Sequence, residues 1–427
     1  MAKDLRNTTL LNHKVVGICL LLVLACERKQ VPAKPDPDAA RLPKVISQVR
    51  LVAVGDIMMH SDVKKAARQS PDQQEAGFPS LWADVVPILK DSDIAFGNLE
   101  TPVAPRSGKP GVPFQFNAPE GLPKALRASG FTILSTANNH AFDQGAVGVT
   151  ETLDRLKEAG IVTVGSGETK AIAEQPIIVK INGIKFAFIA FTDLFNIDLN
   201  RKATEPWVRP LNLEPAKEAI KVLRSQVNVV VVSLHWGNEY QHEPTQRQRD
   251  IAKGLVEAGA DLILASHPHV LQPIEQLEAG GHKAVVAFSL GNFIANQDRF
   301  YRADLFPVGG GDNRDSAALR VTFTKEIDLN GHENVKLRNV SYEPLWTENN
   351  AREMQEGRGG RREVRVLRVN EALELARKEV DRLGDPKSMG DERVRRTALL
   401  EAQERFRTLL LRKQRIAGIV GQNFEER

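Results

Sequence analysis

The 427-residue sequence predicts an α/β fold. Strand and helix patterns alternate from Val49 to about Trp346. Two continuous apolar runs in this region, VVVV and LILA, are typical of strands in a sheet that is covered on both faces. The composition, 42% hydrophobic and 26% charged, is that of a soluble globular protein. The net charge is only +4, and there is no zinc-finger, RNP or helix-turn-helix pattern, so nucleic acid is not expected as a partner.

Residues 1–26 have the pattern of a secretory signal. A basic stretch with Lys3, Arg6 and Lys14 precedes the apolar run 15–25, which is too short for a permanent membrane span. The run ends in VLAC, which resembles a bacterial lipobox, and in that pattern Cys26 becomes the acylated first residue of the mature chain. An ordinary cleaved signal peptide and an uncleaved anchor remain open. All three interpretations predict a protein outside the cytoplasm, either membrane-anchored in a bacterial envelope, or secreted or periplasmic.

The cysteine content agrees with export. Both cysteines of the chain lie within this signal segment. The exported domain is therefore expected to have neither a thiol nor a disulfide, and to depend on its core. Residues 27–45 are rich in proline and charge, and they are interpreted as a tether.

The predicted elements follow in order along the chain. The first strand begins in VRLVAVGD. The hairpin turns on Asn182-Gly183, a dipeptide that favours a tight two-residue turn, and Gly160 is expected to end a helix. The helices are recognised by apolar residues at helical spacing and the strands by short apolar runs. Helices are predicted at 81–92, 148–160, 216–226 and 247–260, and strands at 49–56, 94–98, 131–136, 177–193 (the hairpin), 227–235 and 261–267.

The main domain is predicted to span residues 46–350, and residues 351–427 form a helical extension. After GRGG, residues 357–360, two arginine-rich helical patterns are separated by DPKSMG. We expect a solvated hairpin of helices that packs one apolar stripe on the main domain; a basic surface that faces an anionic polymer or lipid headgroups is the alternative. The glycine-rich segment 308–316 is expected to be a mobile surface loop. It does not fit a phosphate-binding loop, because no Gly-Lys-Ser/Thr follows it.

Polar side chains follow most of the predicted strands. In an open α/β sheet, ligands bind at the carboxyl ends of the strands, so these side chains are expected to meet there. Each has a structural explanation when taken alone, since Asp after Gly caps a turn and Asn-Asn-His can form an Asx-turn. Together they offer oxygen and imidazole ligands without a thiolate, a set that suits a divalent manganese, iron or zinc ion. The residues are Asp56, Asn98, Glu100, Asn138, Asn139, His140, Asp143, His235, Glu239, His267, His269, Ser289 and Asn292.

The ordered series GDIM, GNLE, NNHAFDQG, HWGNEY, SHPHVLQ and SLGNF resembles the bacterial capsule synthesis protein CapA family. The resemblance covers roughly Val49 to Phe293. That family is associated with poly-γ-glutamate capsule synthesis and export, and it is similar in fold to the calcineurin-like metallophosphoesterases. The resemblance implies a four-layer αββα sandwich of two mixed sheets, to which the C-terminal helices are appended.

The resemblance also implies roles for single residues. The metal ligands would be Asp56, Glu100, Asn139, His235, His267 and His269, with Glu100 at the bridging position. His140 would be the catalytic acid or transition-state donor. Asp143 would either orient His140 or cap the following helix, and the two readings are open.

Three further residues are expected on the substrate side of the site. Asn98 and Glu239 would contact substrate, and Trp236 would either stack on substrate or pack in the core. For the pair in His267-Pro268-His269, an extended backbone would point both imidazoles the same way, and the proline would stiffen it.

Two departures from the superfamily pattern concern the metal. Met58 stands where the pattern has a histidine, and the nearest histidine is His60. Glu100 replaces the bridging aspartate. One ion, two ions or none are therefore open.

The leading hypothesis is a metal-dependent hydrolase or transferase at the cell envelope that acts on an anionic or amide-bearing polymer or a peptide-like substrate. One alternative is a metal-free peptide epimerase or isomerase that uses the same cleft. The other is a non-catalytic scaffold lipoprotein in a capsule export complex.

Overall fold

The computed structural model describes residues 43–303, 310–357, 360–388, 391–421 and 424. The predicted signal segment, Cys26 and residues 27–42 of the predicted tether lie outside the described residues. The tether prediction extends two residues too far, because Lys44 and Val45 already belong to the first strand.

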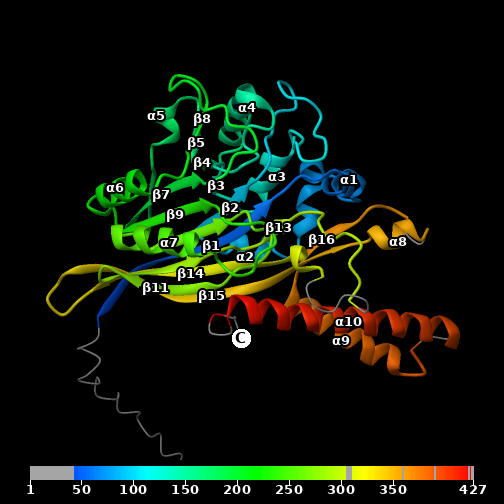
Figure 1. Cartoon of the computed structure of the whole chain (residues 1–427). Coiled ribbons are helices and arrows are strands. Elements are labelled where there is room, and N and C mark those ends of the chain that lie inside the picture. Colours follow the sequence, from blue (N-terminus) through cyan, green and yellow to red (C-terminus); the bar gives the residue numbers. More distant parts are fainter. Residues whose placement is uncertain (1–42, 304–309, 358–359, 389–390, 422–423, 425–427) are drawn as a thin grey trace, which may run out of the picture. The chain divides into compact units, whose positions relative to one another are not determined.

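A mixed eight-stranded sheet forms one half of the core (Figure 1). Its strands lie in the order β16-β15-β14-β1-β2-β3-β4, and β13 pairs with the end of β1. β1 runs parallel to β2 and β13 and antiparallel to β14. The strands are β1 (Lys44–Ile57), β2 (Ile94–Leu99), β3 (Ile133–Ser135), β4 (Val162–Val164), β13 (Asn292–Ile294), β14 (Asp315–Ile327), β15 (Glu333–Asn349) and β16 (Val364–Arg368).

A second mixed sheet has six strands in the order β11-β12-β10-β9-β7-β6. The inner strands are parallel, and β6 and β11 are antiparallel edges. The β6–β7 hairpin turns on Asn182 and Gly183, both at positive φ as the dipeptide predicted. The strands are β6 (Ile177–Ile181), β7 (Ile184–Thr192), β9 (Val229–His235), β10 (Leu262–Ser266), β11 (Ile274–Ala279) and β12 (His282–Ala287); β5 (Ser166–Gly167) and β8 (Trp207–Val208) form a separate small pair.

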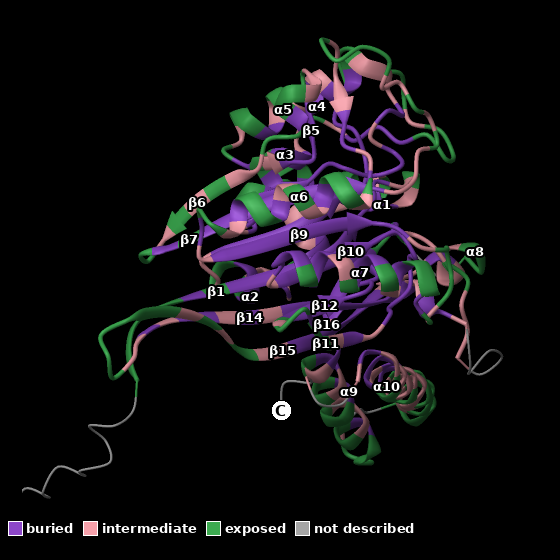
Figure 2. Ribbon diagram, turned by 60° about the vertical axis from the view of Figure 1, so that its left-hand side comes forward, coloured by how far each residue is buried: buried purple, intermediate pink, exposed green. Residues whose placement is uncertain are grey.

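The two sheets pack face to face. Phe96 of β2 stacks on Phe188 of β7 with ring centroids 6.0 Å apart, and both rings belong to the largest buried apolar cluster. The predicted αββα sandwich is confirmed: a second cluster covers the outer face of the eight-stranded sheet, and a third covers that of the six-stranded sheet. In Figure 2 the strands between these layers are mostly purple, and the outer sides of the covering helices are green.

Short helices cover the eight-stranded sheet, and two amphipathic helices cover the other. Thr245 and Gln248 form a capping box at the start of α7, and Gly259 ends that helix in the left-handed conformation. The helices of the main domain are α1 (Ser61–Gln69), the 3₁₀ segment η2 (Gln74–Trp82), α2 (Val86–Lys90), α3 (Leu122–Ala128), α4 (Gly145–Glu158), α5 (Lys170–Ala173), α6 (Leu213–Arg224), α7 (Gln246–Ala258), η3 (Asp312–Arg314) and α8 (Ala351–Gln355).

The C-terminal extension is partly built into the sheet. Residues 364–368 form β16, which pairs antiparallel with β15. The first arginine-rich pattern was predicted to be helical over these residues, and that prediction is wrong because β15 offers them a strand edge. The two predicted helices follow as α9 (Val369–Gly384) and α10 (Glu392–Val420), and they lie side by side beneath β15 (Figure 1). Ala372, Leu409 and Ile416 bring their apolar stripe into the cluster between the sheets. Among the residues that the structure describes, no helix is both long and apolar enough to span a membrane.

One arginine of α10 is fully buried. Nη1 of Arg412 lies 3.1 Å from Oδ1 of Asp312 and 3.3 Å from Oδ2 of Asp315, and its guanidinium lies over the rings of Tyr301 and Trp346. The described part of the glycine-rich segment, residues 310–316, is therefore held beneath α10. The prediction of an exposed mobile loop is wrong for these residues, because a buried charge pair fixes them.

Candidate metal centre

Asp56 is placed by an unusually close approach of β1 to the turn before β13. Its backbone N donates to the carbonyl of Gly291 at 3.0 Å. A Cβ on Gly55 would lie 1.9 Å from that carbonyl oxygen, so only glycine fits before Asp56. The Asp56 side chain is fully buried and accepts a hydrogen bond of 2.8 Å from Nδ2 of Asn98, its partner on β2. Asn98 thus orients Asp56, and the expectation that it contacts substrate is not supported by its buried position.

Glu100 follows β2 and is fully buried. Its Oε1 lies 3.6 Å from Nε2 of His235 and 3.8 Å from Nε2 of His269. Among the described residues, neither of its carboxylate oxygens has a hydrogen-bond partner. Burial and the charge of Asp56 raise the pKa of Glu100 well above its usual range. A buried carboxylate of this kind is costly unless it binds a cation or a proton.

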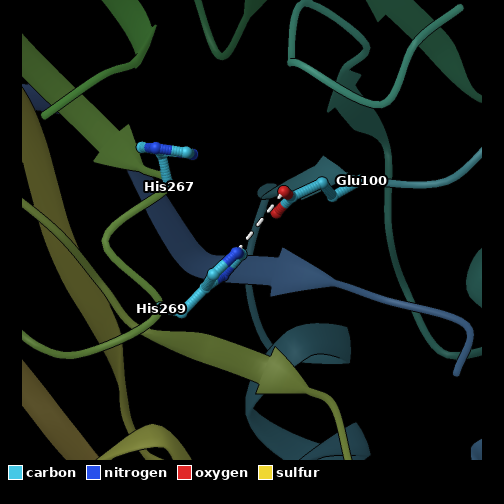
Figure 3. Close-up of side chains that lie close together, drawn as sticks. All are labelled: Glu100, His267 and His269. Atoms are coloured by element: carbon cyan, nitrogen blue, oxygen red, sulfur yellow. Dashed lines mark ion pairs between the residues drawn. The ribbon is translucent and has the colours of Figure 1, made fainter. Parts of the chain in front are cut away.

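His267 and His269 follow β10, and Figure 3 shows the His269 ring directed at Glu100. The backbone N of His267 donates to Oδ2 of Asp56 at 3.3 Å. Nδ1 of His269 lies 3.3 Å from the same oxygen and 3.1 Å from Oδ1 of Asn292. The imidazoles do meet at the predicted place, but the expected extended backbone is wrong. His267 has φ +99° and His269 has φ +57°, conformations that cost energy for residues other than glycine and that occur mostly at functional sites.

The imidazoles of His235 and His267 are held neutral. Burial and the neighbouring His267 lower the pKa of His235 well below its usual range. Burial and the neighbouring His269 lower the pKa of His267 to about 4. A neutral imidazole has the free lone pair that a metal ligand needs. Burial acts to raise the pKa of Asp56, but interactions that include the hydrogen bonds of His269 and Asn98 outweigh it, and the pKa lies well below its usual range.

The carboxylates and imidazoles form two groups of possible ligands that share Glu100. One is Glu100, His267 and His269, the other is Asp56, Glu100 and His235, and in each the ligand atoms lie within 4.8 Å of one another. All five side chains are buried. The unpartnered oxygens of Glu100, the neutral imidazoles and the absence of thiolates from this set fit a divalent metal ion.

Asn139, His140 and Asp143 lie beside the cluster. Oδ1 of Asn139 lies 2.8 Å from Nε2 of His235. Nδ1 of His140 lies 2.8 Å from Oδ2 of Asp143, which also accepts the backbone N–H of Phe116. Gln144 is the N-cap of α4, so the structure places Asp143 in the orienting position of the two that were open.

A protein-family comparison agrees with the motif order. The family model "Bacterial capsule synthesis protein PGA_cap" matches residues 50–297. The chain belongs to this bacterial capsule synthesis family. The resemblance inferred from the sequence motifs is thereby confirmed.

Individual relatives of the PGA_cap family were also found. The "PGA biosynthesis protein CapA" of Bacillus subtilis (strain 168) is 35% identical over 247 residues, which are 57% of this chain and 62% of the relative. The "Capsule biosynthesis protein CapA" of Bacillus anthracis is 34% identical over 258 residues, 58% of this chain and 60% of the relative. The matches therefore span about six tenths of the length of each relative. Among solved structures, a 5'-nucleotidase precursor from Thermus thermophilus aligns with TM-score 0.38 and 14% identity over 85% of this chain and 60% of that one.

The PGA_cap match ends before β14, so β14–β16 and α8–α10 lie outside it. Within the match, Met58 is buried against Phe116 and Ala295. His60 does not replace the missing histidine, because its ring packs on Phe116 and its Nδ1 accepts the backbone N–H of Asn296.

Two residues expected on the substrate side have different surroundings. Trp236 is fully buried, stacks on Phe288 and donates its indole N–H to the Phe288 carbonyl. It is a core residue, and the expectation of substrate stacking is wrong. Glu239 is exposed, and its charge acts on Glu100 and His267.

Sequence reasoning missed Asn196. Its Oδ1 accepts from Nδ2 of Asn139 at 3.2 Å, and its own Nδ2 lies 3.4 Å from the His140 ring nitrogens. Asn196 comes shortly after the end of β7. Its position after a strand end is the same sequence signal that marks the other polar residues of the site.

Proposed function

We propose that the protein is a metal-dependent hydrolase or transferase that acts on an anionic or amide-bearing polymer in capsule or poly-γ-glutamate synthesis. Its similarity to PGA and capsule biosynthesis proteins supports the pathway, and the buried cluster supports the chemistry. The single observation that carries the proposal is Glu100, whose two buried carboxylate oxygens lack hydrogen-bond partners among the described residues while two imidazoles face them.

A divalent ion of manganese, iron or zinc would be held by the cluster side chains. When bound, such an ion supplies Lewis-acid polarisation of a carbonyl or phosphoryl oxygen. The proposed ligands are Asp56, Glu100, Asn139, His235, His267 and His269.

His140 is proposed to move the proton. A carboxylate only accepts hydrogen bonds, so Asp143 keeps a proton on Nδ1 of His140. Nε2 is then left to exchange a proton with the reacting group of a bound substrate. The Phe116 N–H fixes the Asp143 carboxylate, which in turn fixes the ring plane.

We further propose that the chain acts outside the cytoplasm, held at the membrane by a lipid on Cys26. The basic and apolar pattern of residues 1–26 supports this, and so does the confinement of both cysteines to that segment. A capsule export complex is the proposed setting.

The test joins metal content to polymer cleavage. The full chain is purified without chelator or nickel resin, beside Glu100→Ala and His267→Ala, with exposed Glu168→Ala as the matched control. One or two equivalents of metal in the wild type, lost in the two cluster variants together with shortening of γ-linked polyglutamate, are expected. A folded wild type that takes up no manganese, iron or zinc would contradict the proposal and leave metal-free proton transfer or a scaffold. Metal uptake without cleavage of any ester, phosphoester or amide polymer would favour the scaffold.

A further inference from the structure

A cavity of about 660 Å³ lies next to the metal cluster without including its ligands. Its walls come from residues 59–64 after β1, 111–116 after β2, 296–301 after β13, and 310–311. These segments follow the carboxyl ends of neighbouring strands, where α/β sheets bind ligands. The volume lies in the range of small-ligand sites.

One residue separates this cavity from His140. The Phe116 ring lies 4.5 Å from the His140 ring and 5.1 Å from the His60 ring, measured between centroids. Phe116 and His60 both line the cavity, and the backbone N–H of Phe116 is bound to Asp143. A polymer chain bound in the cavity would therefore pass along the Phe116 ring toward His140.

The cavity offers an ammonium group that no carboxylate of the described residues neutralises. Nζ of Lys64 donates to the carbonyl of Asn117 at 3.0 Å, and within the described ranges it forms no ion pair. The loop lies close over it, since a Cβ on Gly111 would come within 3.1 Å of Nζ. Lys64 is half-buried, and burial, followed by the charge of Arg68, lowers its pKa. A partly desolvated cation without a counter-charge gains strongly from binding an anion.

The rest of the lining is of mixed character. Phe116, Phe300 and Val112 give apolar contact surface, and Phe300 and Val112 are exposed. Asp298 brings a negative charge into the same cavity, and its Oδ2 accepts the backbone N–H of Gly311. Arg299, the other cation, already lies 3.4 Å from Asp62. A phosphate polymer would be bound best by several cations that converge on it. An acidic polyamide matches this lining better, because its carboxylate suits the one ammonium, its methylene groups suit the apolar walls, and its amide N–H groups suit the one carboxylate.

We propose that this cavity is a subsite for an acidic polyamide chain, with the Lys64 ammonium binding the free carboxylate of the unit next to the reacting bond. The inference rests on the proposed function, because it takes the reacting bond to lie at His140. Lys64 determines substrate affinity here and takes no part in proton transfer.

The test measures binding of a fluorescent γ-linked glutamate decamer by anisotropy, with the metal-loaded full chain. Lys64→Gln is expected to weaken binding about tenfold, and Lys64→Arg to restore most of it. Lys65→Gln is the matched control, because Lys65 is exposed on the same helix. Unchanged affinity in Lys64→Gln would overturn the proposal.

The wild-type protein provides a second readout that needs no variant. A γ-linked isoglutamine decamer, with an α-carboxamide in place of each free α-carboxylate, is expected to bind about tenfold more weakly than the glutamate decamer. Equal binding of the two, no binding of either, or tighter binding of polyphosphate would overturn the proposal.

Failure of this subsite is distinguishable from failure of the proposed function. Lys64-dependent binding without cleavage would leave the subsite standing and remove the hydrolase. Cleavage with the same KM in wild type and Lys64→Gln would keep the hydrolase and remove the subsite.

Discussion

Nδ1 of His140 lies 2.8 Å from Oδ2 of Asp143, and both side chains are buried beside the metal cluster. His140 and Asp143 are three positions apart in the turn that leads into α4. The same carboxylate oxygen accepts the backbone N–H of Phe116 at 2.6 Å, so one acceptor fixes both the loop and the ring.

Asp143→Ala is expected to release the tautomer of His140. Without the carboxylate oxygen that accepts from Nδ1, nothing holds the ring proton on that nitrogen, and it can move to Nε2. Imidazole ¹⁵N shifts would report this change without any substrate. Polymer turnover should fall roughly a hundredfold or more with metal content unchanged, as expected for a wrong tautomer. An unaltered ¹⁵N spectrum would contradict the orienting role.

Removal of metal is expected to destabilise the wild-type protein. A ligand that binds only the folded state raises its stability, so EDTA should lower the Tm of the wild type. Glu100→Gln, which lacks the shared carboxylate, should show a Tm that EDTA hardly changes. Differential scanning fluorimetry with and without EDTA measures both. An equal EDTA effect in Glu100→Gln would remove Glu100 from the ligand set.

Gly55→Ala should disturb the fold and the site together. The new Cβ would meet the carbonyl of Gly291 at 1.9 Å, and backbone rather than a movable side chain must shift. We expect a loss of roughly 2 kcal/mol or more in the free energy of unfolding and weaker metal binding through displaced Asp56. Gly418→Ala in α10, where a Cβ meets nothing within 4 Å, is the control. Similar unfolding curves for the two variants would show that β1 and the turn can separate freely.

Arg412→Ala is expected to cost about 3–5 kcal/mol of stability, the range for breaking a buried ion pair. Its loss would leave Asp312 and Asp315 buried with less counter-charge, although Arg415 and His242 still contact Asp312. Urea unfolding checks this. Arg407→Ala, an exposed position of the same helix, should change the free energy of unfolding by less than about 0.5 kcal/mol.

The protein should lose stability between pH 6.5 and 4. Burial, followed by the charges of His269 and His140, lowers the pKa of His60 in the folded state to about 4, whereas the unfolded imidazole titrates near 6.5. In this window the unfolded chain binds more protons, so unfolding becomes easier as the pH falls. His60→Asn should reduce the slope of unfolding free energy against pH by up to about one proton. His332→Asn, at an exposed turn, is the control, and equal slopes in both variants would contradict the prediction.

Local patterns were enough to predict the α/β class and the candidate cluster, whereas the sandwich of two sheets was predicted from the resemblance to the CapA family. The turn at Asn182 and Gly183 and the helix end near Gly160 depend on backbone freedom that the residue types themselves provide. The ligand residues were predictable because the carboxyl ends of parallel strands lie at the same edge of each sheet, and each motif follows the end of such a strand.

The parts that were missed depend on distant partners. The segment 364–368 precedes an arginine-rich helix and forms a strand because β15 offers it an edge. Arg412 is one of many arginines in its helix, and only tertiary packing selects it for burial against Asp312. The positive φ of His267 and His269 is imposed by their contacts with Asp56, Asn292 and Glu100, which no local pattern encodes.

The strand order has a consequence for how the protein is made. Ala53 of β1 pairs with Leu319 of β14, and the last edge of that sheet is supplied by residues 364–368. Contacts between such distant residues form slowly, because closing the long loop between them costs conformational entropy before the contacts contribute any stabilising free energy. A nascent chain therefore reaches residue 368, more than four fifths of its length, before the eight-stranded sheet can be complete. Until then the parallel strands of this sheet remain incompletely paired. A chain in this state can be threaded through a channel, and it needs protection from aggregation.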